Sequence, residues 1–367
     1  MASFLLRGET ALKIINKISA FLVILLIILI PIIIFILNNS TNKQIEENAA
    51  NAQNYAKEAS EKQLQLEKDY SEISNEIPGI VCIGSDLMTS NGTVKTVFPS
   101  ALQNKLTNEN YKIPVINLAV AGENTLTVLG RIGVVPFVIQ DTVTIPAESD
   151  LIEINLTSKG NGPVWPLAVS ADNANFNPVT INGLKGMIGG DSIKDPETGE
   201  NKHYFLRSED GEPFTIPAGS IVNTSSDDEY KDYVHIIWLG ENENWNNFKD
   251  LADYIKQIID SSGKNKERYL VMGLIKGSEE GMSEYDKIMI DYFGSHYVNV
   301  RKYLSEYDLN KTDLTFTNTD IEQQKKGIVP SCMLLESGNL NDTAYNLLTE
   351  LVYDKLIAND CIRKPVN

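Results

Sequence analysis

Apolar and polar positions follow two recurring patterns over most of the chain, from about residue 78 to 361. Short uninterrupted apolar runs, typical of strands buried on both faces, occupy 80–83, 115–120, 233–240, 268–275 and the start of 296–304. Apolar residues spaced three and four apart, typical of amphipathic helices, occupy 97–107, 247–262, 284–295 and 343–359. Because strands alternate with helices, the pattern predicts an α/β fold with a doubly wound parallel sheet between two helical layers.

Residues 123–230 break this alternation. They contain short strand patterns between Gly, Pro and Asp turns, and the sequence TIPA occurs twice, at 144–147 and 215–218. We therefore expect a small β-rich insertion at 123–230, with the α/β domain formed by 78–122 and 231–361.

The N-terminal region predicts a membrane anchor. Residues 20–37 form a run of eighteen residues without a charge, at the lower limit for a helix that spans a bilayer. Basic residues precede the run, so the positive-inside rule places 1–19 in the cytoplasm and the globular domain on the extracytoplasmic side of the cell membrane. The first small-residue cleavage pattern lies well downstream, at 50–52, which favours an uncleaved single-pass anchor over a signal peptide.

A helical stalk is expected at 40–75. Positions spaced alternately four and three apart form a seam of about four heptads, but many of them are alanine, which makes a weak seam. Two interpretations stay open. The stalk is either a coiled coil that joins two copies of the chain, or a single solvated helix that separates the globular domain from the membrane.

Net charge and cysteine content indicate which binding partners are unfavourable. The net charge of −17 excludes the basic face that nucleic acids require, and it disfavours peripheral binding to anionic lipid. Three cysteines without a CxxC pair indicate neither a disulfide framework nor a zinc site.

Four short motifs stand out. Three of them directly follow predicted strands, and the fourth directly precedes the final helix. Gly84-Ser85-Asp86-Leu87 comes directly after the first strand, and Gly122 lies in AVAGEN after the second. Asn242 lies in LGENEN after the third strand, and Glu336 and Asn339 lie in LLESGNLND before the final helix. In order and spacing these motifs resemble the four blocks of the SGNH or GDSL hydrolases, and the likeness is greatest to membrane-anchored bacterial members with a β-rich insertion.

That resemblance implies an ester hydrolase fold of the flavodoxin-like three-layer kind. In the family the first block is Gly-Asp-Ser-Leu, whose serine is the nucleophile. Gly122 and Asn242 match the residues that form the oxyanion hole. Glu336 and Asn339 match the acid and the histidine of the triad.

This chain departs from the family at the reacting groups. Asp86 stands where the resemblance places the nucleophile, and Asn339 stands where it places the base, although an amide does not take up a proton near neutral pH. A carboxylate at position 86 is expected at a helix N-terminus, bonded to the Gly122 and Asn242 donors like an internal plug. Ser85 is expected to face elsewhere and to lack a base. Of the three histidines, His235 is expected to be packed in a strand, and His203 and His296 lie in the insertion and near a late strand.

The oxygen-rich set of Asp86, Glu336, Asn242 and Asn339 would also suit a hard cation such as Ca²⁺. The local spacing does not resemble a calcium loop, so we expect the acids to be hydrogen-bonded to amides, with no metal and no cofactor.

Two functions therefore remain. The first is a membrane-anchored pseudo-hydrolase that binds a glycan, a cell-wall fragment or a protein partner through its cleft or its insertion. The second is an active esterase or acetyl transferase that acts on O-acyl groups of extracellular polysaccharide through an unfamiliar arrangement.

Overall fold

The computed structural model describes residues 77–89, 97–158, 176–190, 202–224, 229–243, 245 and 247–363, with a few positions between 25 and 62. Residues 77–367 form one compact unit, and residues 1–76 form another. Nearly all of the anchor expected at 20–37 and most of the stalk expected at 40–75 lie outside the described residues. In the part of the chain that the structure does describe, no helix combines the length and apolar character needed to cross a bilayer.

The compact unit is built on a parallel sheet of five strands, as the strand and helix pattern predicts. The strands are β1 (Ile80–Gly84), β2 (Val115–Asn117), β12 (Val234–Trp238), β13 (Tyr269–Met272) and β14 (Tyr297–Val298). Their order across the sheet is β14-β13-β12-β1-β2, and every pair is parallel. From β1 the chain adds β2 on one side of the sheet and then β12, β13 and β14 on the other side. The carboxyl ends of β1 and β12 therefore form the topological switch point, where doubly wound proteins bind their ligands.

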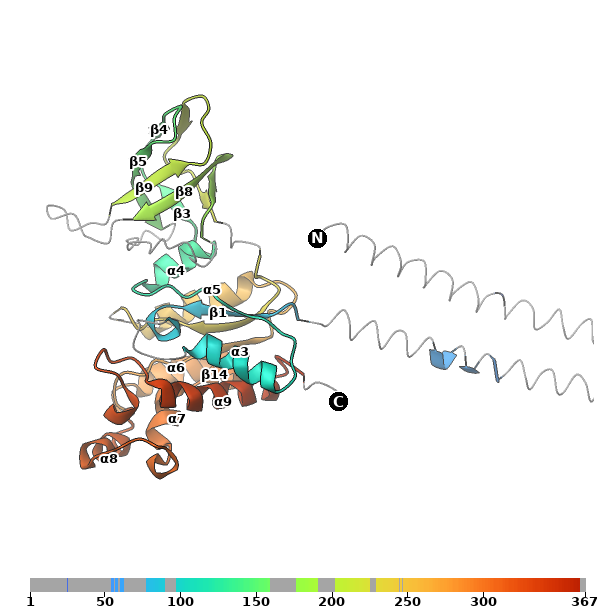
Figure 1. Cartoon of the computed structure of the whole chain (residues 1–367), viewed down its shortest axis with the longest axis vertical. Coiled ribbons are helices and arrows are strands. Elements are labelled where there is room, and N and C mark those ends of the chain that lie inside the picture. Colours follow the sequence, from blue (N-terminus) through green and yellow to red (C-terminus); the bar gives the residue numbers. More distant parts are fainter. Residues whose placement is uncertain are drawn as a thin grey trace, which may run out of the picture. The chain divides into compact units, whose positions relative to one another are not determined.

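Helices cover both faces of this sheet (Figure 1). One face carries α3 (Phe98–Asn108), α7 (Val300–Glu306) and α9 (Asp342–Ala358), and the other carries α4 (Thr125–Arg131), α5 (Phe248–Ser261) and α6 (Ser283–Phe293). A further helix, α8 (Asn318–Lys325), packs against α7. An apolar core lies on each face of the sheet. In strand β1, Ile80 and Cys82 point into one core, and Val81 and Ile83 point into the other. The alternation follows from the two-residue period of a strand.

The insertion is a separate β structure with its own apolar core. Its strands are β3 (Phe137–Ile139), β4 (Val143–Ile145), β5 (Leu151–Ile154), β6 (Leu156–Ser158), β7 (Val179–Ile181), β8 (Leu184–Gly190), β9 (His203–Arg207), β10 (Phe214–Ile216) and β11 (Val222–Asn223). Five of them form an antiparallel sheet in the order β11-β7-β8-β9-β5. The two TIPA segments pair with each other, with Thr144 opposite Thr215 in the β4–β10 ladder. The repeat is therefore a cross-strand pair.

Helix α4 marks where the insertion begins. It lies inside the residues expected to form the insertion, yet its Val128 and Leu129 pack in the core between the sheet and α5. The strands of the insertion start only at Phe137 in β3. Gly130 allows the two parts to meet, because a Cβ at that position would lie 2.2 Å from the ring of Phe137.

Replacing Gly130 by alanine tests this contact. Because the added methyl group overlaps an aromatic ring that is fully buried, we expect Gly130→Ala to lower the free energy of unfolding by about 1 to 3 kcal/mol. Chemical denaturation of the full-length chain measures the change. Gly281→Ala is the matched control, since its nearest neighbour would be the Ser278 hydroxyl at 3.3 Å, and it should change stability by less than about 0.5 kcal/mol. Equal effects of the two substitutions would contradict the contact.

Candidate functional site

The candidate site begins where β1 ends. Gly84 is the last residue of the strand, and a Cβ there would lie 2.7 Å from the carbonyl oxygen of Trp238 on β12. Ser85 follows as a buried residue, and Asp86 opens η1 (Asp86–Met88), a single 3₁₀ turn. From the sequence we expected Asp86 at a helix N-terminus, where the helix dipole favours a carboxylate. A three-residue turn is too short to provide that dipole, so hydrogen bonds alone must hold the carboxylate.

The Asp86 carboxylate accepts both hydrogen bonds that the sequence led us to expect. The backbone N–H of Gly122 donates to Oδ2 over 3.0 Å, and the side-chain amide of Asn242 donates to the same oxygen over 2.6 Å. Gly122 follows β2 with a φ of 80°, a conformation that favours glycine. The two donors that the family resemblance assigns to the oxyanion hole therefore point at one atom, and that atom belongs to Asp86.

Asn242 is shared among three acceptors. Its Nδ2 lies 2.6 Å from Asp86 Oδ2, 2.9 Å from the carbonyl oxygen of Glu123 and 3.3 Å from Ser85 Oγ. An amide nitrogen carries only two hydrogens, and the two shorter contacts are the better hydrogen bonds. Ser85 Oγ therefore lies next to the Asn242 amide, but the hydrogen bond between them is the weakest of the three.

Three buried glutamates surround Asn242. Burial raises the pKa of the Glu123, Glu241 and Glu243 carboxyls. The Arg131 guanidinium, 2.9 Å from Glu123, opposes that rise, and backbone N–H donors from Ile275 and Thr125 oppose it at Glu241 and Glu243. Each of the three carboxyls therefore has its own donor, in Arg131, Ile275 and Thr125 respectively, and burial makes each a weaker acid.

Among the described residues, no hydrogen bond or ion pair joins Glu336 or Asn339 to the residues of the first three motifs. Glu336 and Asn339 lie in the turn between Leu334 and Leu340, which are joined by a β-bridge. Glu336 is exposed and Asn339 is half-buried. Across the described residues, neither side chain forms a hydrogen bond or ion pair with the others of the predicted site. No set of three or more His, Cys, Asp and Glu side chains in the described part of the chain is arranged to hold a metal ion.

The helix that follows this motif does reach the site. Tyr345, in the first turns of α9, donates its hydroxyl to the carbonyl oxygen of Leu87 over 2.9 Å. Burial raises the pKa of Tyr345, and the nearby charge of Asp86 raises it further. Tyr345 therefore holds the η1 turn in place as a neutral phenol. The sequence predicted only that Tyr345 lies in a helix at 343–359.

Each histidine is committed elsewhere. His296 stacks on Tyr269 with ring centroids 4.3 Å apart, and its Nδ1 lies 2.8 Å from the Tyr269 carbonyl oxygen. His235 is buried in β12, as expected, with Nδ1 3.3 Å from Ser262 Oγ. His203 is buried in β9 of the insertion. All three histidines of the chain thus lie away from Ser85, and none is available there as a base.

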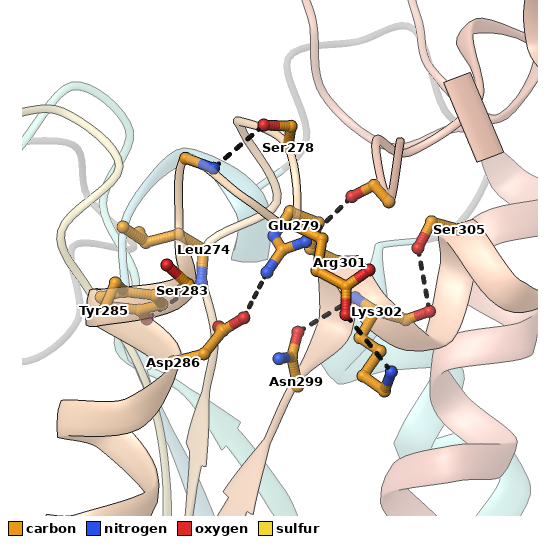
Figure 2. Close-up of polar contacts among 12 residues, drawn as sticks. Leu274, Ser278, Glu279, Ser283, Tyr285, Asp286, Asn299, Arg301, Lys302 and Ser305 are labelled. Atoms are coloured by element: carbon orange, nitrogen blue, oxygen red, sulfur yellow. Dashed lines mark hydrogen bonds and ion pairs between the residues drawn. The ribbon is translucent and has the colours of Figure 1, made fainter. Parts of the chain in front are cut away.

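A second polar network braces the neighbouring loop, and sequence reasoning missed it. Figure 2 shows Asp286 of α6 turned toward Arg301 of α7, with which it forms an ion pair. Arg301 also donates to the Gly327 carbonyl oxygen over 2.9 Å, and Tyr285 accepts from the Leu274 N–H over 3.1 Å. The loop after β13, which also binds Glu241, is therefore fixed from both sides.

The chain is an α/β protein whose carboxyl sheet edge carries a carboxylate held by two neighbouring donors. Comparison with protein-family models, curated protein sequences and solved structures finds no match.

The Asp86–Asn242 bond can be measured by a double-mutant cycle. We expect Asp86→Ala and Asn242→Ala to be coupled by about 2 kcal/mol of unfolding free energy, because hydrogen bonds to charged groups are worth about that much. Urea denaturation of the two single variants and the double variant gives the coupling. Asn247→Ala is the control, because Asn247 caps α5 and shares no hydrogen-bond partner with Asp86. Coupling below about 0.5 kcal/mol for the Asp86–Asn242 pair would contradict the geometry.

His235 should make stability depend on pH. Burial lowers the pKa of His235 from 6.5 to about 4, so below the ordinary value the unfolded chain binds a proton that the folded chain does not. Stability should therefore be full above pH 6.5 and should fall as the pH drops toward 4, by about 3 kcal/mol in all. Urea denaturation across this range measures the slope. His235→Gln should flatten it relative to His296→Gln, and an unchanged slope in His235→Gln would refute the assignment.

Proposed function

We propose that this chain is a membrane-anchored, extracytoplasmic pseudo-hydrolase of the SGNH or GDSL type. It does not turn over esters, and it binds a glycan, a cell-wall fragment or a protein partner. The observation that carries the proposal is the Asp86 carboxylate, which takes up the Gly122 N–H and the Asn242 amide at 3.0 and 2.6 Å.

The occupied donors speak against ester hydrolysis. An oxyanion hole works because its donors are free to bind the negative oxygen that develops in the transition state. Here a full negative charge already holds them, and a second oxygen anion beside Asp86 would be repelled.

The placement of the histidines speaks against it independently. A serine hydroxyl is a weak nucleophile until a neighbouring base removes its proton. Among the described residues, the Ser85 hydroxyl receives the long contact from Asn242, and His235 and His296 are bound elsewhere in the fold. Loss of one triad member alone typically lowers turnover by several powers of ten.

One observation favours the alternative, an active esterase or acetyl transferase on extracellular polysaccharide. Ser85 Oγ lies 3.3 Å from Asn242 Nδ2, so a hydroxyl does lie next to a donor of the expected kind. In that case Asp86 would have to leave the donors when substrate binds.

Ester turnover and covalent labelling separate the two functions. We expect the full-length chain to hydrolyse p-nitrophenyl acetate no faster than its Asn242→Ala variant, because the Asp86 carboxylate occupies the two donors. We also expect no labelling of Ser85 by a fluorophosphonate probe, read by peptide mass spectrometry. Activity gained by the Asp86→Ser, Asn339→His double variant would support the loss of a working triad.

Turnover by the parent chain that disappears in Asn242→Ala, or a fluorophosphonate adduct on Ser85, would instead establish the esterase. Binding is checked by cosedimentation of the full-length chain with insoluble cell-wall polysaccharide. The heat-unfolded chain serves as the control for non-specific retention.

A further inference from the structure

An apolar row crosses the outer face of the five-stranded sheet of the insertion. Strands β5, β9 and β8 lie side by side there (Figure 1), and Leu151, Leu206 and Met187 stand opposite one another in the register. Residues directly opposite each other on antiparallel strands point to the same face. Their neighbours along the strands, Phe205 and Ile188, fill the core of the insertion on the other face. The row therefore points away from that core.

This apolar row is accessible at the surface. Leu151 is 66% exposed and Met187 is 47% exposed, with half-buried Leu206 between them. In the described part of residues 77–367, the only other large apolar side chains that are exposed are Ile221 and Ile290. Contiguous apolar surface, unlike a single exposed apolar side chain, points to an interaction site.

Acidic loops border the row at one end. Residues 146–150 lead into β5, and residues 208–212 follow β9. Arg207 holds these loops together, because its guanidinium donates to the Pro146 carbonyl oxygen over 2.5 Å and to the Glu209 carbonyl oxygen over 2.6 Å. The loops carry five exposed acids, namely Glu148, Asp150, Glu209, Asp210 and Glu212.

The charge of these loops is not neutralised within the described stretches of the chain, where none of the five acids forms an ion pair. Two lysines lie nearby. Lys185 is two residues before Met187 on β8, and so lies on the same face of the sheet, and Lys202 pairs with Glu153 at 3.6 Å. The acids outnumber these cations, so the border of the apolar row is negatively charged.

Charge and apolarity together select the partner. The acids repel nucleic acid, acidic polysaccharide and anionic lipid. They also oppose a second copy of this chain, whose net charge is −17. A basic amphipathic helix fits both features, because one stripe of such a helix is apolar and cations flank that stripe. Helices pack an apolar stripe on the face of a sheet in the same way inside layered folds.

We propose that the outer face of β5, β9 and β8 is a docking surface for a basic amphipathic helix of a partner protein. The apolar stripe of that helix covers Leu151, Leu206 and Met187, and its cations lie over the acidic loops at 146–150 and 208–212. The proposal names a partner for the insertion alone, so it does not depend on whether the Asp86 site turns over esters.

A synthetic peptide tests the docking surface. The probe is a labelled peptide of about fourteen leucine and lysine residues, arranged to give a helix with one apolar face. Its fluorescence anisotropy is measured with the full-length chain in phosphatidylcholine nanodiscs, with empty nanodiscs as the background. We expect a dissociation constant on the order of micromolar, at least about tenfold lower than for a peptide of the same composition in scrambled order. Absence of binding, or equal affinity for the two peptides, would overturn the proposal.

Exchange of an apolar side chain locates the binding. Leu151→Ser removes an exposed side chain from the row without opening the core, and it should lower the affinity for the amphipathic peptide by at least about fivefold. Ile290→Ser makes the corresponding change at an exposed position on α6 and should leave the affinity within about twofold of the parent. Equal effects of the two substitutions would contradict this site.

Neutralising the acids is the second arm. Asp150→Asn combined with Glu209→Gln should weaken binding by about threefold, because each exposed ion pair contributes modestly. Asp291→Asn combined with Glu284→Gln removes the same number of exposed charges from α6 and should have no such effect. If the chain alone forms a dimer that Leu151→Ser abolishes, a second copy covers this face and the proposal is wrong.

Discussion

The site depends on one interaction, the binding of the Asp86 carboxylate by the Gly122 N–H and the Asn242 amide. These groups follow β1, β2 and β12, which are neighbours in the sheet and run parallel. Parallel strands end at the same edge, so three segments distant in sequence are brought to one point. A charged acceptor there fixes the loops to each other. The same contact that joins the loops at the sheet edge therefore occupies both donors.

Much of this arrangement could be predicted from the sequence. The apolar runs located all five strands of the parallel sheet, because strands buried on both faces have few polar interruptions. The family resemblance had grouped Asp86, Gly122 and Asn242 with Glu336 and Asn339. The first three do meet, because residues that follow neighbouring parallel strands lie at one edge, whereas no hydrogen bond among the described residues joins the last two to them. The details of Asp86 were less predictable, since a three-residue 3₁₀ turn and a long helix begin with similar sequences.

Features that rest on tertiary packing were missed. The two TIPA segments did not reveal that they pair with each other. The antiparallel pairing of Thr144 with Thr215 depends on how the roughly seventy residues between them fold back. Helix α4 was assigned to the insertion because it is too short to show a clear period, and only packing against α5 identifies it as part of the sheet domain. The raised pKa of the Glu241 and Glu243 carboxyls likewise comes from burial, which a sequence of alternating Glu and Asn does not reveal.

The Asp86 carboxylate and the oxyanion of an ester transition state would bind to the same two donors, the Gly122 N–H and the Asn242 amide. A catalyst gains rate only from interactions that are stronger in the transition state than before it. Donors already bound to Asp86 stabilise the resting protein, so an incoming oxyanion must first displace a charge-assisted hydrogen bond of 2.6 Å. Breaking that hydrogen bond would raise the activation free energy of ester hydrolysis by about the free energy that the bond contributes to folding. Stability at this edge and ester chemistry at this edge are therefore opposed, and the arrangement of Tyr345 and Asn242 around Asp86 favours stability.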